Sequence, residues 1–188
     1  MPPRNPPSAG DDGPVGGHRC RGAIIAAMQR PPRKRSVWAW ALYDWANSAY
    51  ATTVMAGFFP VFFKEYWSAG VPAGQSSFHL GLANSVASLV IVLLAPLLGA
   101  IADRGRSHKR FLAVGAGVGI AATGGLYFLG QGAWGAAAVL YTAATIGFSA
   151  SLIFYDSLIV SVAPAGRFDT VSALGFGLGY LGGGILLA

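Results

Sequence analysis

The sequence predicts an all-α polytopic membrane protein, and three observations support this fold class. Of its 188 residues, 54% are hydrophobic and only 11% are charged, with a mean hydropathy of +0.53. This composition is more apolar than that of ordinary soluble domains. Several separate windows also reach the length of about 20 mostly apolar residues that a bilayer span requires. None of these windows has a charged face at helical spacing, which argues against a soluble helical bundle.

Five transmembrane helices are expected in order along the chain. They are Val37–Phe63, Phe78–Ala102, Phe111–Leu129, Trp134–Ala163 and Val171–Ala188. The 27 glycines fit this interpretation, because small residues let membrane helices pack closely. The last window is still apolar where the sequence ends, so the membrane part, residues 37–188, is expected to be incomplete.

The basic residues predict an orientation in the membrane. Twelve of the 13 Lys and Arg residues lie before the first span, between the second and third spans, or between the fourth and fifth. Only Lys64 lies in a loop of the other parity. By the positive-inside rule, the N-terminus is expected in the cytoplasm, with the loops near Ala69 and Gln131 outside, in a plasma (inner) membrane. The basic segments lack aromatic residues, so nucleic acid is not an expected partner.

Residues 1–36 are rich in Pro, Gly and Arg and are expected to form a disordered basic cytoplasmic tail. Their apolar stretch Gly22–Met28 is followed by a basic segment rather than a cleavage site, so no cleaved signal peptide is expected. Translation starting at Met28 is an alternative. The single cysteine, Cys20, lies in this tail, which excludes thiolate metal sites from the membrane part. No cofactor, metal or nucleotide motif is found.

The first span carries polar residues where hydrocarbon is expected. Four of them follow i, i+3, i+4, i+8 spacing and form what we call the polar stripe: Asp44, Asn47, Ser48 and Thr52. A charged group inside a membrane costs several kcal/mol unless it faces a bundle interior or a water-filled cavity. The polar stripe is therefore expected to line a substrate or proton pathway, with a structural hydrogen-bond anchor as the alternative.

The fourth span repeats the Tyr-Asp pair as Tyr155–Asp156, which joins the same candidate pathway. The two spans run in opposite directions, and a helical rise of ~1.5 Å per residue puts both carboxyl groups ~10 Å from the cytoplasmic end. Two intramembrane aspartates also suggest an aspartyl protease dyad, in which one proton is shared. The sequence has no Gly-x-Gly-Asp motif, so an enzyme is not expected.

Two further motifs are candidates for gating and packing. The loop "GAIADRGRSHKRF" between the second and third spans supplies the candidate gate residues Gly99, Asp103, Arg104, Gly105, Arg106, Lys109 and Arg110. A solvated basic loop is the plainer interpretation. In the fifth span, Gly175, Gly179 and Gly183 recur every four residues and form one face for close helix packing.

The loop motif resembles the signature loop of the major facilitator superfamily. "LYDWANSAYATTV" and "FPVFF" in the first span resemble its vacuole-effluxer-like branch, whose eukaryotic members are vacuolar amino-acid exporters. "FYDSLI" and "GFGLGYLGGG" are similar to the same branch. The resemblance implies twelve helices in two six-helix halves that rock about a central cavity. It also implies that Asp103 and its basic neighbours hold a cytoplasmic gate against a C-terminal half that this sequence lacks.

The sequence therefore predicts part of a secondary active transporter that moves small solutes, such as amino acids, by ion-coupled alternating access. No ATP-binding motif is present, so the expected driving force is an ion gradient, with protons favoured. A non-transporting membrane scaffold made of a half-protein is the main alternative.

Overall fold

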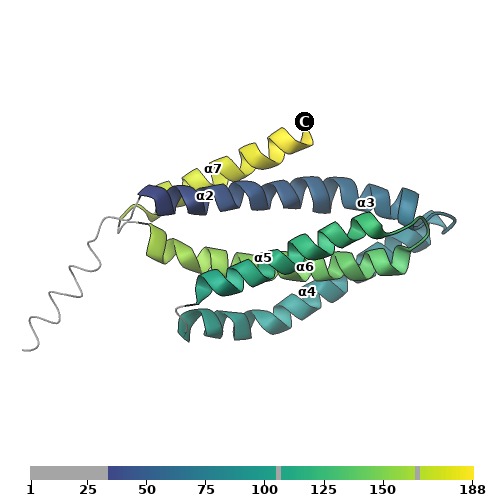
Figure 1. Ribbon diagram of the computed structural model, residues 1–188, viewed down its shortest axis with the longest axis horizontal. Coiled ribbons are helices and arrows are strands. Elements are labelled where there is room, and N and C mark those ends of the chain that lie inside the picture. Colours follow the sequence, from purple (N-terminus) through teal and green to yellow (C-terminus); the bar gives the residue numbers. More distant parts are fainter. Residues whose placement is uncertain (1–33, 105–106, 164–165) are drawn as a thin grey trace, which may run out of the picture.

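The computed structural model describes residues 34–104, 107–163 and 166–188, and all its regular elements are helical (Figure 1). The first helical stretch runs without a break through α2 (Lys34–Ala49), η1 (Tyr50–Phe58), α3 (Phe59–Phe62) and η2 (Phe63–Trp67). The remaining elements are α4 (Ala73–Arg104), α5 (His108–Gly125), η3 (Leu126–Phe128), α6 (Trp134–Val162) and α7 (Phe168–Leu187). The predicted tail lies outside the described residues, except for 34–36, which begin α2.

Four of the helical stretches are long and apolar enough to cross a membrane. They are Ala73–Ile101, His108–Phe128, Trp134–Val162 and Phe168–Leu187. These stretches match the last four expected spans, which confirms an all-α polytopic membrane protein. The first expected span is also helical along its length, but it alternates between α- and π-helical geometry.

The π-helical segments widen the first span near its middle and at its far end. The amide of Phe59 donates to the carbonyl of Val54, and the amide of Ser68 donates to the carbonyl of Phe63, each five residues earlier. Pro60 follows the first π segment. A proline ring would meet the carbonyl four residues before it in a regular α-helix, and a wider turn before the proline relieves that contact.

The helices pack as two groups that meet through the first span (Figure 1). Helix α6 packs along both α5 and α4, whereas α2 packs along α7 and touches α6 less extensively. The starts of α2, α5 and α7 gather at one end of the bundle with the ends of α4 and α6. The sequence places twelve of its 13 basic residues at or before these helix ends.

Glycines set the closest approach between α5 and α6. A Cβ atom added at Gly147 would lie 2.7 Å from both the carbonyl oxygen of Gly115 and the amide nitrogen of Gly119. Both atoms belong to the backbone, so the two helices could not stay at this distance with any larger residue there. This crossing fixes α6, which carries Tyr155 and Asp156, against α5.

Candidate functional site

The residues of the polar stripe face different neighbouring helices in the structure. Asp44, Ser48 and Thr52 lie against α7, whereas Asn47 lines a cavity toward α5 and α6. At about 100° per residue, the stripe covers about 140° of the helix circumference. An arc this wide can contact two different helices, and the pathway role of the four residues stays a prediction.

The glycine face of α7 lies directly against Asp44, Ser48 and Thr52 of the first span. A Cβ atom at Gly179 would lie 2.6 Å from Ser48 Oγ and 2.9 Å from Asp44 Oδ2. A Cβ atom at Gly183 would lie 2.8 Å from Thr52 Oγ1. Each of these distances is shorter than a normal van der Waals contact, so the polar side chains occupy the space that larger residues on α7 would fill.

Asn47 faces a cavity of about 270 Å³ between the first span, α5 and α6. The cavity is lined by Tyr43, Ala46, Asn47, Tyr50, Ala116, Gly119, Ile120, Thr123, Phe148 and Ser151. Its walls are mainly apolar, with an amide and a few hydroxyl groups. Ligand pockets commonly have this character: an apolar wall with a small number of polar groups that orient the ligand.

Hydrogen bonds fix two polar groups of this cavity across different helices. The Tyr43 hydroxyl donates to Ser151 Oγ at 2.9 Å, and Ser151 Oγ donates to the carbonyl of Phe148 at 2.7 Å. On the α5 side, the hydroxyl oxygens of Tyr50 and Thr123 lie 3.4 Å apart. The cavity therefore has hydroxyl groups held in place on both sides of the Asn47 amide.

Tyr155 stacks on two aromatic rings of α2. Its ring stacks on Trp40 with centroids 4.6 Å apart, and on Tyr43 with centroids 5.2 Å apart. Its hydroxyl is buried, and no residue within the described ranges forms a hydrogen bond with it. Asp156 follows Tyr155 in the chain and Asp44 follows Tyr43, so the stacked rings belong to the neighbours of both carboxyl-bearing residues.

The carboxyl groups of Asp44 and Asp156 come from α2 and α6 and lie within electrostatic range of each other. Asp44 is half-buried, and Asp156 is exposed on α6. In the described part of the chain, no cationic side chain is among the charges that act on either of them. No group of three or more His, Cys, Asp or Glu residues gathers within residues 34–104, 107–163 and 166–188 to hold a metal ion.

The candidate gate loop is only partly described. Gly99 is half-buried within α4, and the backbones of Asp103 and Arg104 complete that helix. Gly105 and Arg106 lie outside the described residues. Lys109 and Arg110 are exposed on the first turn of α5. The gate role of these residues stays a prediction.

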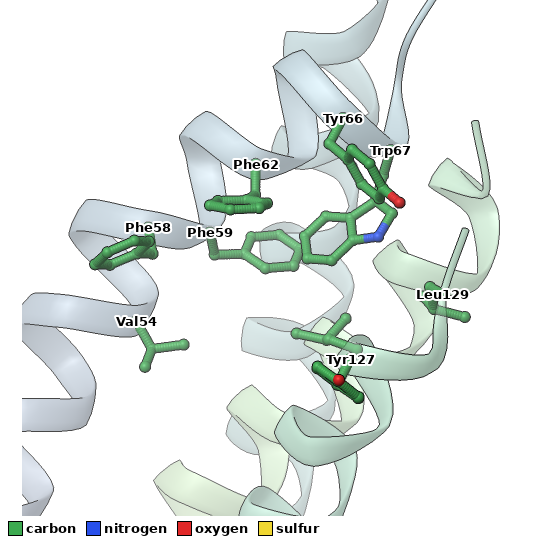
Figure 2. Close-up of a pocket in the computed structure, with 9 residues that line it drawn as sticks. Val54, Phe58, Phe59, Phe62, Tyr66, Trp67, Tyr127 and Leu129 are labelled. Atoms are coloured by element: carbon green, nitrogen blue, oxygen red, sulfur yellow. The ribbon is translucent and has the colours of Figure 1, made fainter. Parts of the chain in front are cut away.

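A second and larger cavity, of about 360 Å³, lies at the opposite end of the first span (Figure 2). Phe58, Phe59, Phe62 and Trp67 lie along one wall, facing Tyr127 and Leu129 across the opening. No carboxylate or cationic side chain lines it. Its aromatic walls suit the level of the membrane interface, where such rings are enriched, and it is not a candidate for an ion-coupled step.

Sequence reasoning missed several residues that build the site. Tyr43 and Tyr50 flank Asn47 at helical spacing, so the periodicity of the first span could have identified them. Thr123 and Ser151 come from other helices and carry no local signal. Trp40, which stacks on Tyr155, lies near the start of the first span and carries no local signal of this contact.

Comparisons with known proteins address the same motifs. Residues 68–166 match the family described as vacuole effluxer Atg22 like. The range includes Asp103, Tyr155 and Asp156. The chain is also 41% identical over 145 residues to an uncharacterized MFS-type transporter, YxiO, of Bacillus subtilis (strain 168), an alignment that covers 77% of this chain.

The chain belongs to the vacuole effluxer Atg22-like family. This membership confirms the relationship that the first-span, loop and fourth-span motifs predicted. The chain spans about a third of the length of the relative that it matches, 34%. No solved structure matches it at a significant level.

Proposed function

We propose that this vacuole effluxer Atg22-like chain is part of a secondary active transporter that moves small solutes across a membrane by ion-coupled alternating access. Family membership supports transport rather than peptide cleavage. The observation that carries the proposal is that two carboxyl groups, Asp44 on α2 and Asp156 on α6, lie on helices of the bundle that contact each other. Such intramembrane carboxylates mark ion or substrate pathways.

The cavity beside Asn47 is the proposed place for part of the solute. Its volume of about 270 Å³ suits a small molecule, and its walls offer an amide and hydroxyl groups among apolar side chains. Amino acids are the proposed solute class, in keeping with the resemblance of the first-span motif. Asp44 lies about 60° further around the first span, against α7, so ion binding and solute contact would occur at adjacent parts of the same helix face.

The orientation and the compartment are part of the same proposal. The charge distribution favours a cytoplasmic N-terminus in a plasma membrane. A C-terminal half, beyond the third of the relative's length that this chain spans, would complete the transport path. The proposed coupling ion is the proton, because a carboxyl pair of like charge gains stability when one member is protonated.

The test uses the full-length protein in liposomes, with an imposed pH gradient and radiolabelled L-amino acids as probes. Asp44→Asn keeps the size and hydrogen-bonding shape of the side chain but cannot release a proton. If Asp44 carries the coupled proton, this variant loses gradient-driven accumulation but still exchanges labelled for unlabelled solute at equal pH. Asp169→Asn is the matched control, because Asp169 is an exposed carboxylate in the first turn of α7.

The possible results separate the roles of Asp44. Loss of both accumulation and exchange would assign Asp44 to solute binding. Unchanged accumulation would exclude it from coupling and leave it as a structural anchor. Absence of amino-acid uptake by the unmodified protein, under gradients of either direction, would reject the proposed solute class.

A further inference from the structure

Gly179 is distinguished from the other glycines of α7 by what surrounds it. The three atoms nearest to a Cβ atom added there are Ser48 Oγ at 2.6 Å, Asp44 Oδ2 at 2.9 Å and Ser48 Cβ at 3.5 Å. All three belong to side chains of the polar stripe. A methyl group at this point would therefore displace the carboxyl and the hydroxyl rather than the α2 backbone.

Two other glycines of the same helix have different surroundings. A Cβ atom at Gly182 would meet the backbone carbonyl oxygen and the indole ring of Trp45, so a side chain there would push α2 and α7 apart. A Cβ atom at Gly177 would meet nothing within 4 Å. The same Gly→Ala change on α7 therefore has three expected outcomes. It displaces side chains at Gly179, separates two helices at Gly182 and makes no contact at Gly177.

The Asp44 carboxyl occupies the space that a side chain at Gly179 would fill. No hydrogen bond or cation within the described residues acts on it, and the one charge that does is the repelling charge of Asp156. The open space at Gly179 lets the carboxyl lie between α2 and α7, beside Ser48, which is one turn further along α2.

We propose that Gly179 is a positioning residue: by carrying no side chain, it holds open the space in which the Asp44 carboxyl and the Ser48 hydroxyl lie against α7. The inference rests on the proposed function, in which Asp44 takes part in coupling. It adds that α7 determines where the first span presents that carboxyl. Movement of α7 relative to α2 would then change the surroundings of Asp44 directly.

The test measures pH-gradient-driven accumulation of radiolabelled L-amino acids by the full-length protein in liposomes. Gly179→Ala is expected to reduce accumulation by roughly ten- to a hundredfold, the effect typical of a reacting group displaced by about 1 Å. It is also expected to shift the pH at which accumulation is half-maximal, because the displaced carboxyl meets different surroundings. Gly177→Ala is expected to match the unmodified protein in both measurements.

A second substitution tests the mechanism by removing the side-chain oxygen that an added methyl group at Gly179 would meet first. Ser48→Ala removes the oxygen nearest to the added methyl group and leaves Asp44 Oδ2 at 2.9 Å, so the double variant Ser48→Ala/Gly179→Ala is expected to regain part of the accumulation and of the normal pH dependence. Ser48→Ala alone supplies the reference level. Thermal unfolding in detergent, measured for every variant, is expected to show a loss of stability for Gly182→Ala but not for Gly179→Ala.

Several results would overturn the inference. One is a Gly179→Ala variant that loses stability as Gly182→Ala does and is not rescued by Ser48→Ala, since that pattern indicates helix packing alone. Another is a Gly179→Ala variant indistinguishable from Gly177→Ala. If Asp44→Asn abolishes coupling in either case, the proposed function stands and only the positioning role fails. If Asp44→Asn has no effect while Gly179→Ala does, both the coupling role of Asp44 and its positioning by Gly179 are rejected.

Discussion

The indole ring of Trp40 lies parallel to the ring of Tyr155, with an interplanar angle of 9° and centroids 4.6 Å apart. The indole Nε1 donates to the backbone carbonyl of Tyr155 at 3.2 Å. This contact joins residues 115 positions apart and fixes the first span against α6 at the level of the two carboxyl groups. Such ring pairs contribute about 0.5–1.5 kcal/mol beyond the burial of their area.

Gly175 lies against the edge of the Trp40 indole and gives the first prediction. A Cβ atom there would lie 2.6 Å from Trp40 Cζ3. Because the indole is already stacked and hydrogen-bonded, Gly175→Ala is expected to destabilise the protein by about 1–3 kcal/mol, the usual range for overpacking. Thermal unfolding in detergent measures the effect, with Gly184→Ala on the same helix as the control, since nothing lies within 4 Å of its Cβ position. Equal stability of the two variants would contradict the packing described.

The crossing of α5 and α6 gives the second prediction. Gly147→Ala would place a methyl group 2.7 Å from backbone atoms of α5, so the two helices must separate. Stability is expected to fall more than in Gly175→Ala, because no side chain can rotate away. Gly135→Ala is the matched control on α6, with nothing within 4 Å of its Cβ position. Unfolding curves that coincide for these two α6 variants would show that the crossing is looser than described.

Orientation gives the third prediction. In a Cys20→Ser background, Gln75→Cys is expected to react with an impermeant thiol reagent in intact cells, and Ser107→Cys is not. Gln75 is exposed near the start of α4, and Ser107 precedes α5 at the end of the bundle that carries the basic residues. Permeabilised cells, in which both cysteines should react, provide the control. The reverse labelling pattern would reject a cytoplasmic N-terminus.

The cavity beside Asn47 gives the fourth prediction. Asn47→Leu has a similar size but cannot form hydrogen bonds, so the apparent KM for the transported solute is expected to rise by about two- to tenfold, the worth of one hydrogen bond. Solute uptake at varied concentration in liposomes measures the change. Gln75→Leu, an amide lost from an exposed site, is the control. An unchanged KM would indicate that the solute does not contact this amide.

The fold class could be predicted from the sequence because it depends on local properties. A stretch of apolar residues long enough for the bilayer must form a helix, since lipid offers no partner for free backbone groups. The spans expected from hydropathy accordingly match helices α4, α5, α6 and α7 to within a few residues. Local pattern did not reveal the π-helical turns before and after Pro60, because they depend on how the backbone accommodates the proline ring and its neighbours.

Only part of the candidate site could be predicted from the sequence. Intramembrane carboxylates are conspicuous at Asp44 and Asp156 because burying a charge in hydrocarbon is costly. Periodicity placed Asn47 and Asp44 on one face, yet the structure directs them to different neighbours. Which part of a wide polar arc meets which helix depends on where the neighbouring helices pack, and spacing within one helix carries no such information.

By itself, the sequence determined that this chain is helical, where its membrane spans lie, which family motifs it carries and that carboxyl groups lie within its spans. Only the tertiary structure decided that Gly179 lies beside Asp44 and Ser48. It also decided that Trp40 stacks on Tyr155. The same holds for the cavity that Asn47 lines together with Thr123 and Ser151. The physical reason is the range of the forces involved. Hydrophobic transfer and backbone hydrogen bonding act on each segment separately, whereas contacts between helices depend on the shapes of two surfaces far apart in the chain.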